Sequence, residues 1–154
     1  VETVAGVLAA TELEARFLEL ELTERTVMHD AEQTLGTLRT LNRMGVELAL
    51  DDFGTGYSSL AYLKRFPVGK LKIDRSFVRD LEVDSDDRAI ASTILSMGHS
   101  LRLKVLAEGV ETAEQYAILR DMGCELVQGY HFSRPLPADQ FVAFLKQHSS
   151  QKGK

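Results

Sequence analysis

Several features are scarce in this sequence of 154 residues, and each scarcity excludes a class of protein. There is one cysteine, Cys124, so the chain forms no internal disulfide and no cysteine-based metal site, and a reducing, cytoplasmic setting is expected. No apolar run is long enough to span a bilayer, and the N-terminus lacks the features of a signal peptide. The net charge of −5 excludes a basic surface for a nucleic-acid polymer, although metals or a few lysines can still bind a local phosphate.

The composition fits one domain with a hydrophobic core. Hydrophobic residues make up 44% of the chain and charged residues 27%, which is sufficient for a core at this length. The sequence begins within a pattern at Val1 and has no initiator methionine, so we expect it to be part of a longer protein. We assign 1–147 to the domain and expect the polar segment 148–154 to be a disordered tail.

Apolar residues recur at helical spacing in some segments and alternate in others, which predicts helices between strands. The expected helices cover 4–16, 30–44, 58–66, 84–101, 112–123 and 139–145, and the expected strands cover 17–22, 46–50, 68–73, 103–107 and 124–127. This alternation predicts right-handed βαβ units and a parallel sheet. The chain holds about five such units, whereas a full barrel has eight. The predicted fold class is therefore α/β, an incomplete (β/α) TIM-type barrel with its first strands missing. A doubly wound sheet is the alternative.

The most informative stretch is an apolar run that ends in two adjacent carboxylates, Asp51 and Asp52. Adjacent residues on a strand point to opposite faces, so both acids share one site only if the strand ends there. Gly54 and Gly56, which follow at once, indicate such an end. The alternative is an aspartate that caps a helix after a turn. The same order of apolar strand, acid and loop recurs along the chain.

The polar residues at the strand ends form one set: Glu21, Glu24, Asp51, Asp52, Lys72, Asp74, Glu108, Glu111 and Gln128. In a parallel barrel they would gather at one mouth, where carboxylates repel one another unless cations such as Mg²⁺ or Mn²⁺ bind. Two such ions bridged by Asp51 would suit in-line attack on a phosphodiester. Lys72 would then balance the phosphate charge or orient the attacking water. The alternative is that these residues are ordinary helix caps and solvated loop acids.

Five segments in this order and spacing resemble one known family. They are Glu21-Leu22-Thr23-Glu24, Asp51-Asp52-Phe53-Gly54-Thr55-Gly56-Tyr57-Ser58-Ser59-Leu60, Leu71-Lys72-Ile73-Asp74, Ala107-Glu108-Gly109-Val110-Glu111 and Gln128-Gly129-Tyr130. Over residues 4–145 the pattern resembles the bacterial EAL-domain cyclic-di-GMP phosphodiesterases. The resemblance implies a modified TIM barrel, cytoplasmic signalling, and opening of cyclic di-GMP to linear pGpG with Mg²⁺ or Mn²⁺.

The resemblance also implies a role for each matching residue. Glu21 and Asp51 resemble ligands of a first metal ion, and Asp51 also contacts a second ion. Asp52 resembles a ligand of that second ion. Glu108 is similar to the acid that holds a metal or its water and has been considered as general base, and Lys72 to the lysine beside the nucleophilic water.

Three further residues receive supporting roles from the same resemblance. Glu24 resembles the acid that anchors the loop over 53–59, which in the family links the metal site to a dimer contact. Glu111 and Gln128 match polar residues that line the substrate pocket. We expect Asp74 and Tyr130 at the substrate or pocket as well, with loop packing as the alternative for Tyr130.

The sequence departs from the family pattern at its start. The Glu-Ala-Leu strand and the following strand with an asparagine ligand do not occur. With two metal ligands fewer, we expect this chain to hydrolyse cyclic di-GMP far more slowly than a version extended upstream. Two other functions stay open, a module that binds cyclic di-GMP without cutting it and a protein-interaction module. Open barrel edges also predict a homodimer or a swapped oligomer.

Overall fold

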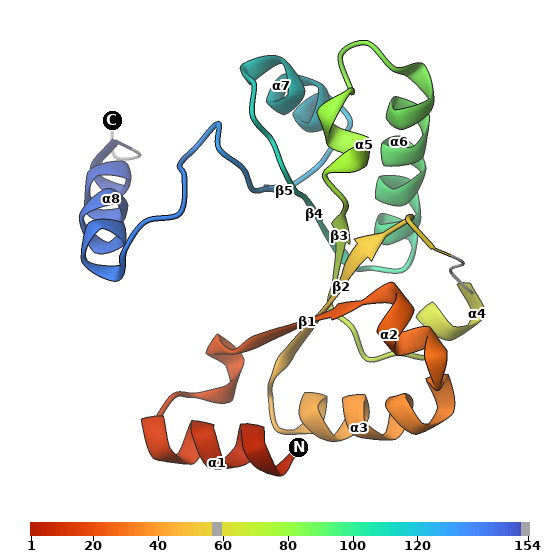
Figure 1. Ribbon diagram of the computed structural model, residues 1–154, viewed down its shortest axis with the longest axis vertical. Coiled ribbons are helices and arrows are strands. Elements are labelled where there is room, and N and C mark those ends of the chain that lie inside the picture. Colours follow the sequence, from red (N-terminus) through yellow and green to blue (C-terminus); the bar gives the residue numbers. More distant parts are fainter. Residues whose placement is uncertain (57–59, 152–154) are drawn as a thin grey trace.

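The computed structural model describes residues 1–56 and 60–151, in which five parallel strands are joined by helices (Figure 1). The strands are β1 (Glu19–Thr23), β2 (Glu47–Phe53), β3 (Lys70–Ile73), β4 (Lys104–Ala107) and β5 (Leu126–Val127). They lie in chain order in one sheet, and each neighbouring pair is parallel. A doubly wound sheet reverses its strand order at one point, and this sheet does not. The predicted incomplete barrel is confirmed, with β1 and β5 at open edges.

The helices alternate with the strands, and four of the described helices begin at a polar residue whose side chain caps the helix. The helices are α1 (Glu2–Thr11), α2 (Glu24–His29), α3 (Ala31–Arg43), α4 (Leu60–Leu63), α5 (Ser76–Arg79), α6 (Ser85–Ser100), α7 (Ala113–Asp121) and α8 (Ala138–Gln151), with a 3₁₀ turn at Ala15–Phe17. The Asp84 carboxylate accepts from the backbone N–H groups of Asp86 and Asp87 at the start of α6. Thr112 and Gln115 form a capping box at the start of α7. These caps confirm the starts that we predicted for both helices.

Several boundaries differ from those predicted. The first helix ends at Thr11 rather than near residue 16, and β1 begins at Glu19 rather than at residue 17. The short helices α2 and α5 were not predicted, because six and four residues are too few to show helical periodicity. Helix α8 continues to Gln151, into the segment that we expected to be a tail. Residues 57–59, at the start of one predicted helix, and 152–154 lie outside the described residues.

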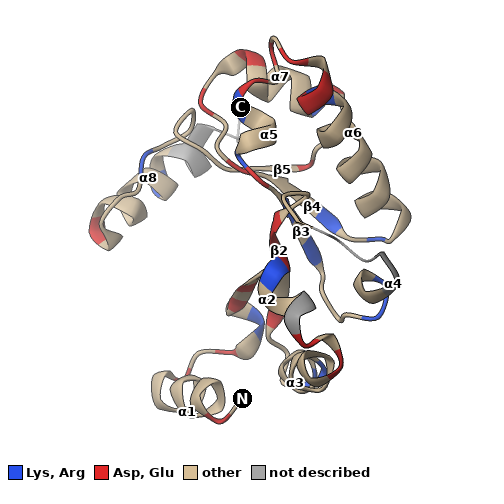
Figure 2. Cartoon of the chain, turned by 45° about the vertical axis from the view of Figure 1, so that its right-hand side comes forward, with Lys and Arg blue, Asp and Glu red and all other residues tan. Residues whose placement is uncertain are grey.

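The core lies on the outer face of the sheet, where the helices cover alternate strand residues. Leu48 and Leu50 of β2 are buried against the apolar stripe of α3, and Leu71 and Ile73 of β3 belong to the same core. The residues between them point to the inner face, since side chains alternate along a strand. That inner face is charged, and Figure 2 shows basic segments on β3 and β4 near the middle of the sheet. Hydrophobic burial therefore fixes the outer face of β2 and β3, and ionic contacts of β1, β2 and β3 lie on the inner face.

Two helices at the ends of the chain contribute little to this core. Helix α1 has no buried residue, and α8 stands away from the sheet in Figures 1 and 2. Among the described residues, none of the helices combines the length and the apolar character that a membrane crossing requires.

Two glycines in helices give a matched test of this packing. A Cβ atom at Gly98 of α6 would lie 2.3 Å from Val105 Cγ2 of β4, whereas a Cβ atom at Gly36 of α3 has nothing within 4 Å. We expect Gly98→Ala to lower the free energy of unfolding by about 1–3 kcal/mol through overpacking. Gly36→Ala should raise it by up to about 1 kcal/mol through helix propensity. Urea unfolding of both variants measures the two signs, and equal effects would contradict the α6–β4 contact.

Candidate functional site

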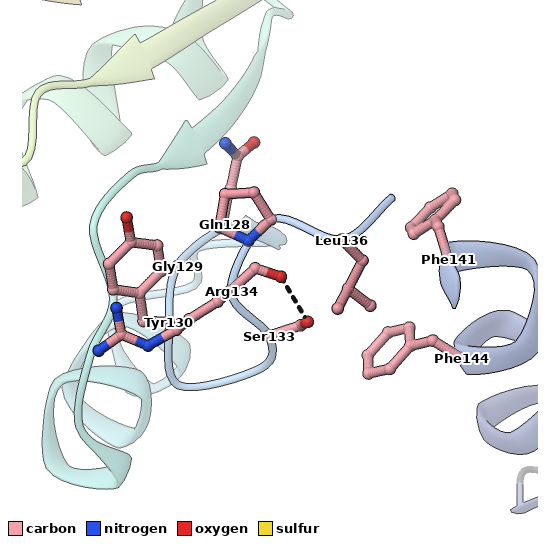
Figure 3. A pocket seen from close by; sticks show the side chains of 9 residues that line it. Gln128, Gly129, Tyr130, Ser133, Arg134, Leu136, Phe141 and Phe144 are labelled. Atoms are coloured by element: carbon pink, nitrogen blue, oxygen red, sulfur yellow. Dashed lines mark hydrogen bonds between the residues drawn. The ribbon is translucent and has the colours of Figure 1, made fainter. Parts of the chain in front are cut away.

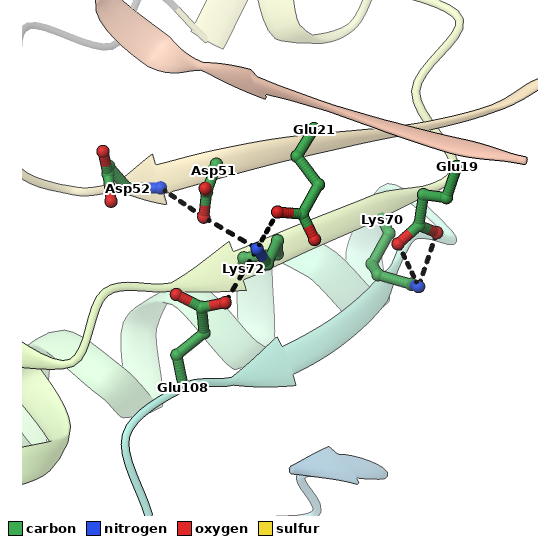
Figure 4. Close-up of polar contacts among 7 residues, drawn as sticks. All are labelled: Glu19, Glu21, Asp51, Asp52, Lys70, Lys72 and Glu108. Atoms are coloured by element: carbon green, nitrogen blue, oxygen red, sulfur yellow. Dashed lines mark hydrogen bonds and ion pairs between the residues drawn. The ribbon is translucent and has the colours of Figure 1, made fainter. Parts of the chain in front are cut away.

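A buried lysine binds three carboxylates on the inner face of the sheet (Figure 4). Lys72 Nζ lies 2.7 Å from Glu21 Oε2, 3.1 Å from Asp51 Oδ1 and 2.7 Å from Glu108 Oε1. The Lys72 side chain is 4% exposed, whereas the three carboxylates are partly open to solvent. The structure therefore brings together four residues that the sequence placed at four different strand ends.

The strands position these side chains without help from long loops. Glu21 belongs to β1, Asp51 to β2 and Lys72 to β3, while Glu108 directly follows β4. The Glu108 N–H donates to the Ile73 carbonyl at the end of β3, which holds the start of that loop in line with the sheet. Because the carboxyl ends of parallel strands meet at one edge, neighbouring strand ends converge there.

The charge state of Lys72 follows from its three contacts. Burial disfavours the charged ammonium, but the hydrogen bonds to Glu108, Glu21 and Asp51 outweigh burial, and the pKa of Lys72 is raised. Burial raises the pKa of Glu108, and the contact with Lys72 offsets this effect only in part. Lys72 is thus a permanent cation at neutral pH. Glu108 therefore holds a proton more readily than an ordinary glutamate does.

The aspartate pair lies within β2, which continues to Phe53 instead of ending at Leu50 as predicted. Both carboxylates nevertheless reach the site edge, because the strand is irregular there. The register with β3 shifts between Leu50 and Phe53, and Asp52 has a left-handed backbone with φ of 54°. The Asp52 N–H donates to Asp51 Oδ1 at 3.0 Å. A bulge of this kind redirects one side chain, so two adjacent residues can serve one site.

Asp52 faces Asp74 rather than Lys72. Burial, then the carboxylates of Asp51 and Asp74, raise the pKa of Asp52. Burial acts in the same direction on Asp74, but hydrogen bonds from the Ser76 N–H (2.9 Å) and hydroxyl outweigh it, and the pKa of Asp74 is lowered. Asp74 therefore belongs to a second, smaller carboxylate pair beside the cluster, and Ser76, which sequence reasoning missed, keeps it ionised.

Glu24 connects this edge to the segment after β2. Its side chain is buried, and Glu24 Oε2 accepts from the Gly54 N–H at 3.3 Å. Glu24 Oε1 would lie 3.0 Å from a Cβ atom at Gly56, so the absence of a side chain there lets the loop approach. Glu24 Oε1 itself has no hydrogen-bond partner among the described residues. The predicted contact between Glu24 and the glycine-rich loop is thus present, whereas Phe53 is buried and packs in the core instead of facing a ligand.

The predicted pocket residues line a separate hollow next to Glu108. A cavity of about 200 Å³ is lined by Arg75, Glu108, Gly109, Glu111, Gln128, Gly129 and Tyr130. Glu111, Gln128 and Tyr130 were predicted from the sequence, and Arg75 was not. No motif singled out Arg75, and its place follows from Gly109, whose missing side chain leaves room for the Arg75 Cβ atom.

A larger cavity of about 390 Å³ lies beyond Tyr130 and extends to α8 (Figure 3). The Arg134 guanidinium lies over the Tyr130 ring at 4.7 Å from its centroid, and the Ser133 hydroxyl donates to the Arg134 carbonyl. Phe141 and Phe144 of α8 form the opposite wall. The half-exposed Tyr130 is therefore shared by both cavities.

The side chains at the cluster fit a divalent cation in donor type. Glu21, Asp51 and Glu108 offer the hard oxygen atoms that Mg²⁺ and Mn²⁺ prefer. Within 1–56 and 60–151, no group of three or more histidine, cysteine or acidic side chains has the arrangement of a metal site. The three carboxylates bind the Lys72 ammonium instead. Together with Asp52, they are the residues that would hold a divalent ion, once their oxygen atoms turn from the ammonium toward it.

Comparison with known proteins supports one family. The EAL domain model matches residues 1–135. Two proteins of Pseudomonas aeruginosa are among the similar curated proteins, a cyclic di-GMP phosphodiesterase called NbdA and a bifunctional diguanylate cyclase/cyclic di-GMP phosphodiesterase called MucR. NbdA is 51% identical over 96% of this chain and MucR 50% identical over 93%. The chain spans about a fifth of the length of each, 19% and 21% respectively.

Solved structures resemble the fold closely. The PaMucR phosphodiesterase in complex with c-di-GMP is 50% identical, with a TM-score of 0.89 over 91% of this chain and 57% of that chain. BlrP1 of Klebsiella pneumoniae, in a manganese/c-di-GMP complex, is 37% identical, with a TM-score of 0.80 over 87% of this chain and 34% of that chain. The five-stranded unit thus matches part of larger domains.

The ion cluster can be tested through stability. Lys72→Met would leave three carboxylates facing one another, and we expect it to lower the free energy of unfolding at pH 7 by about 3 kcal/mol. Because the folded-state pKa of Lys72 is raised, its stabilisation is present below the ordinary lysine pKa and is lost only as pH rises through the folded value. The loss should shrink in acid, where the carboxylates are protonated. Lys64→Met, at an exposed lysine, is the control, and equal losses in both variants would contradict the cluster.

Proposed function

The chain belongs to the EAL domain family, and from this premise we propose that it supplies catalytic residues of a hydrolase that opens cyclic di-GMP to linear pGpG. The observation that supports the proposal most directly is the convergence of Glu21, Asp51 and Glu108 on the buried Lys72. Four charged side chains at one sheet edge are unusual in a core that serves stability alone, because removing charges from water costs free energy.

The proposed roles follow the chemistry of each group. Glu21, Asp51, Asp52 and Glu108 would hold two divalent ions, and Asp51 would be shared between them. Bound ions supply a water molecule of lowered pKa and neutralise charge on the phosphodiester. The bulge at Asp52 serves this role, because it turns the second aspartate to the same edge as the first.

Lys72 and Glu108 act on the water and on the phosphate. The Lys72 ammonium is a fixed donor that orients a water molecule and offsets the negative charge that develops on the phosphate oxygens. Glu108, whose pKa is raised by burial, accepts the proton of that water as the general base. Both groups come from neighbouring strands, so their separation varies little.

The remaining predicted residues serve the substrate and the loop. Gln128, Glu111 and Tyr130 line the cavity beside Glu108, where an amide, a carboxylate and an aromatic face suit a guanine base. Glu24 anchors the loop over 53–59 by accepting from the Gly54 N–H. Asp74 acts indirectly, through its charge beside Asp52. A cytoplasmic location accords with the free thiol of Cys124.

The open sheet favours a second function, binding of cyclic di-GMP without rapid hydrolysis. Five strands surround the cluster on one side only, and Lys72 neutralises carboxylates that would otherwise attract a metal. We therefore propose slow turnover by this chain compared with the complete domain of a relative such as MucR.

The two functions separate in one pair of measurements. With Mn²⁺ present, we expect the chain to form pGpG slowly, and Glu108→Gln to reduce the rate about 100-fold or more because a general base is lost. Chromatography of the nucleotide measures the rate, and calorimetry measures cyclic di-GMP binding. Glu125→Gln, at an exposed position, is the control. Binding without any pGpG from the unmodified chain would support the sensing function, and absence of both would overturn the proposal.

We also propose that the chain self-associates, as a homodimer or a swapped oligomer. The backbone groups at the edges of β1 and β5 have no neighbouring strand in the described fold, and open edges pair with other chains. Phe141 and Val142 of α8 are about half exposed.

Sedimentation velocity tests this association. We expect species larger than a monomer at micromolar concentration, and a shift toward monomer in the double variant Phe141→Ser/Val142→Ser. Val83→Ser is the control, because Val83 is 87% exposed but lies far from α8 in the chain. A compact monomer at all concentrations would contradict self-association.

A further inference from the structure

A second lysine–glutamate pair lies next to the Lys72 cluster, two residues earlier along β3 and β1. Lys70 Nζ donates to both carboxylate oxygens of Glu19, at 2.8 and 2.5 Å. Lys70 and Glu19 precede Lys72 and Glu21 by two residues, so both pairs lie on the inner face of the sheet. Figure 4 shows the two pairs side by side, each reaching from β3 across β2 to β1. The proposed function assigns no role to this second pair.

The strand register alone would pair the lysines differently. Ala49 of β2 is the register partner of both Lys70 and Glu21, so these three residues form one row across the sheet. Because Ala49 has only a methyl group, nothing in that row separates the Lys70 ammonium from Glu21. Lys70 nevertheless binds Glu19, which lies two residues before Glu21 on β1, and Glu21 binds Lys72. Glu21 thus forms no ion pair with Lys70, the lysine in its own row of the sheet.

A positive charge on β4, on the other side of Lys70, makes the contact between Lys70 and Glu19 important for the cluster. Lys104 of β4 is the register partner of Lys70, so two like charges lie in neighbouring positions. Without Glu19, repulsion from Lys104 and attraction to Glu21 would both move the Lys70 ammonium toward the cluster. The Lys70 and Glu19 side chains are only 18% and 31% exposed, so water screens their contact less than that of a typical surface pair.

We propose that Glu19 and Lys70 form a positioning pair for the site. Glu19 holds the Lys70 ammonium away from the row that contains Glu21. Glu21 is then free to bind Lys72, and a second ammonium is kept out of the cluster. The inference rests on the proposed function only for its effect on metal binding and turnover. The assignment of lysines to carboxylates holds whether or not the chain is an enzyme.

The test uses one charge change at two neighbouring positions. Glu19→Gln removes the negative partner of Lys70. Glu47→Gln removes the same charge from the register partner of Glu19 on β2, and Glu47 has no ion pair among the described residues. The readout is the NMR signal of the Lys72 NH₃⁺ group in the full chain without metal or nucleotide, identified by its loss in Lys72→Met.

We expect Glu19→Gln to shift the Lys72 signal and Glu47→Gln to leave it in place. Adding Lys70→Met to Glu19→Gln should return the signal to its original position, because the competing ammonium is gone. A merely structural role would not give this rescue, since the double variant still lacks the ion pair. If Glu19→Gln does not fold, Glu19→Asp should shift the signal in the same direction by a smaller amount.

A second measurement follows the site itself. The dissociation constant for Mn²⁺, titrated alone, should rise about tenfold in Glu19→Gln and return in the double variant, a change of about 1.4 kcal/mol. An unchanged Lys72 signal in Glu19→Gln, or a double variant that stays shifted, would overturn the inference. Loss of hydrolysis in Glu108→Gln together with an unchanged Lys72 signal in Glu19→Gln would uphold the proposed function and reject this inference alone. A signal that shifts in Glu19→Gln and returns in the double variant, in a chain that forms no pGpG, would uphold this inference and reject the proposed hydrolysis.

Discussion

The contact of one ammonium with three carboxylates is the constraint on which the inner face of this sheet depends. Lys72 is buried, and a buried charge is tolerated only where partners satisfy it. Its three partners come from three other elements, so the cluster links the first four strands by charge as well as by backbone hydrogen bonds. The outer face follows a different rule, because there the leucines of β2 and β3 pack against helices. β1 and β3 are therefore apolar on one side and ionic on the other.

This arrangement explains how a site can be ordered before it meets a ligand. Five carboxylates at one edge would repel one another, but Lys72 neutralises part of their charge and Ser76 stabilises the ionised form of Asp74. The groups are then held near their working positions by contacts within the chain. A divalent ion would have to replace the contact with Lys72 by a contact of its own, but it would not have to order loose side chains. Preorganisation of this kind lowers the entropic cost of binding.

The sequence predicted parallel strands in chain order, and it singled out polar residues that the structure brings together, because both depend on local patterns. The alternation of helices and strands, with a polar residue near the end of each strand, pointed to Glu21, Lys72 and Glu108. The bulge at Asp52 was missed because it arises from the pairing of β2 with β3, which leaves no local signature. Arg75 was missed for a similar reason, since its place depends on Gly109, which is distant in the sequence. The contact of Ser76 with Asp74 is local, and no motif singled it out. Contacts between rows, such as that of Lys70 with Glu19, likewise require the register.

The strands lie in the sheet in the same order as in the chain, and this affects how further strands can be added. Each strand pairs only with the strands before and after it in the chain, so the sheet is built as a linear series in which each step uses the edge that the last one left. Further βα units can then be added at either edge without rearranging those already formed. A partial barrel with its strands in chain order therefore leaves both edges, at β1 and β5, available for such additions.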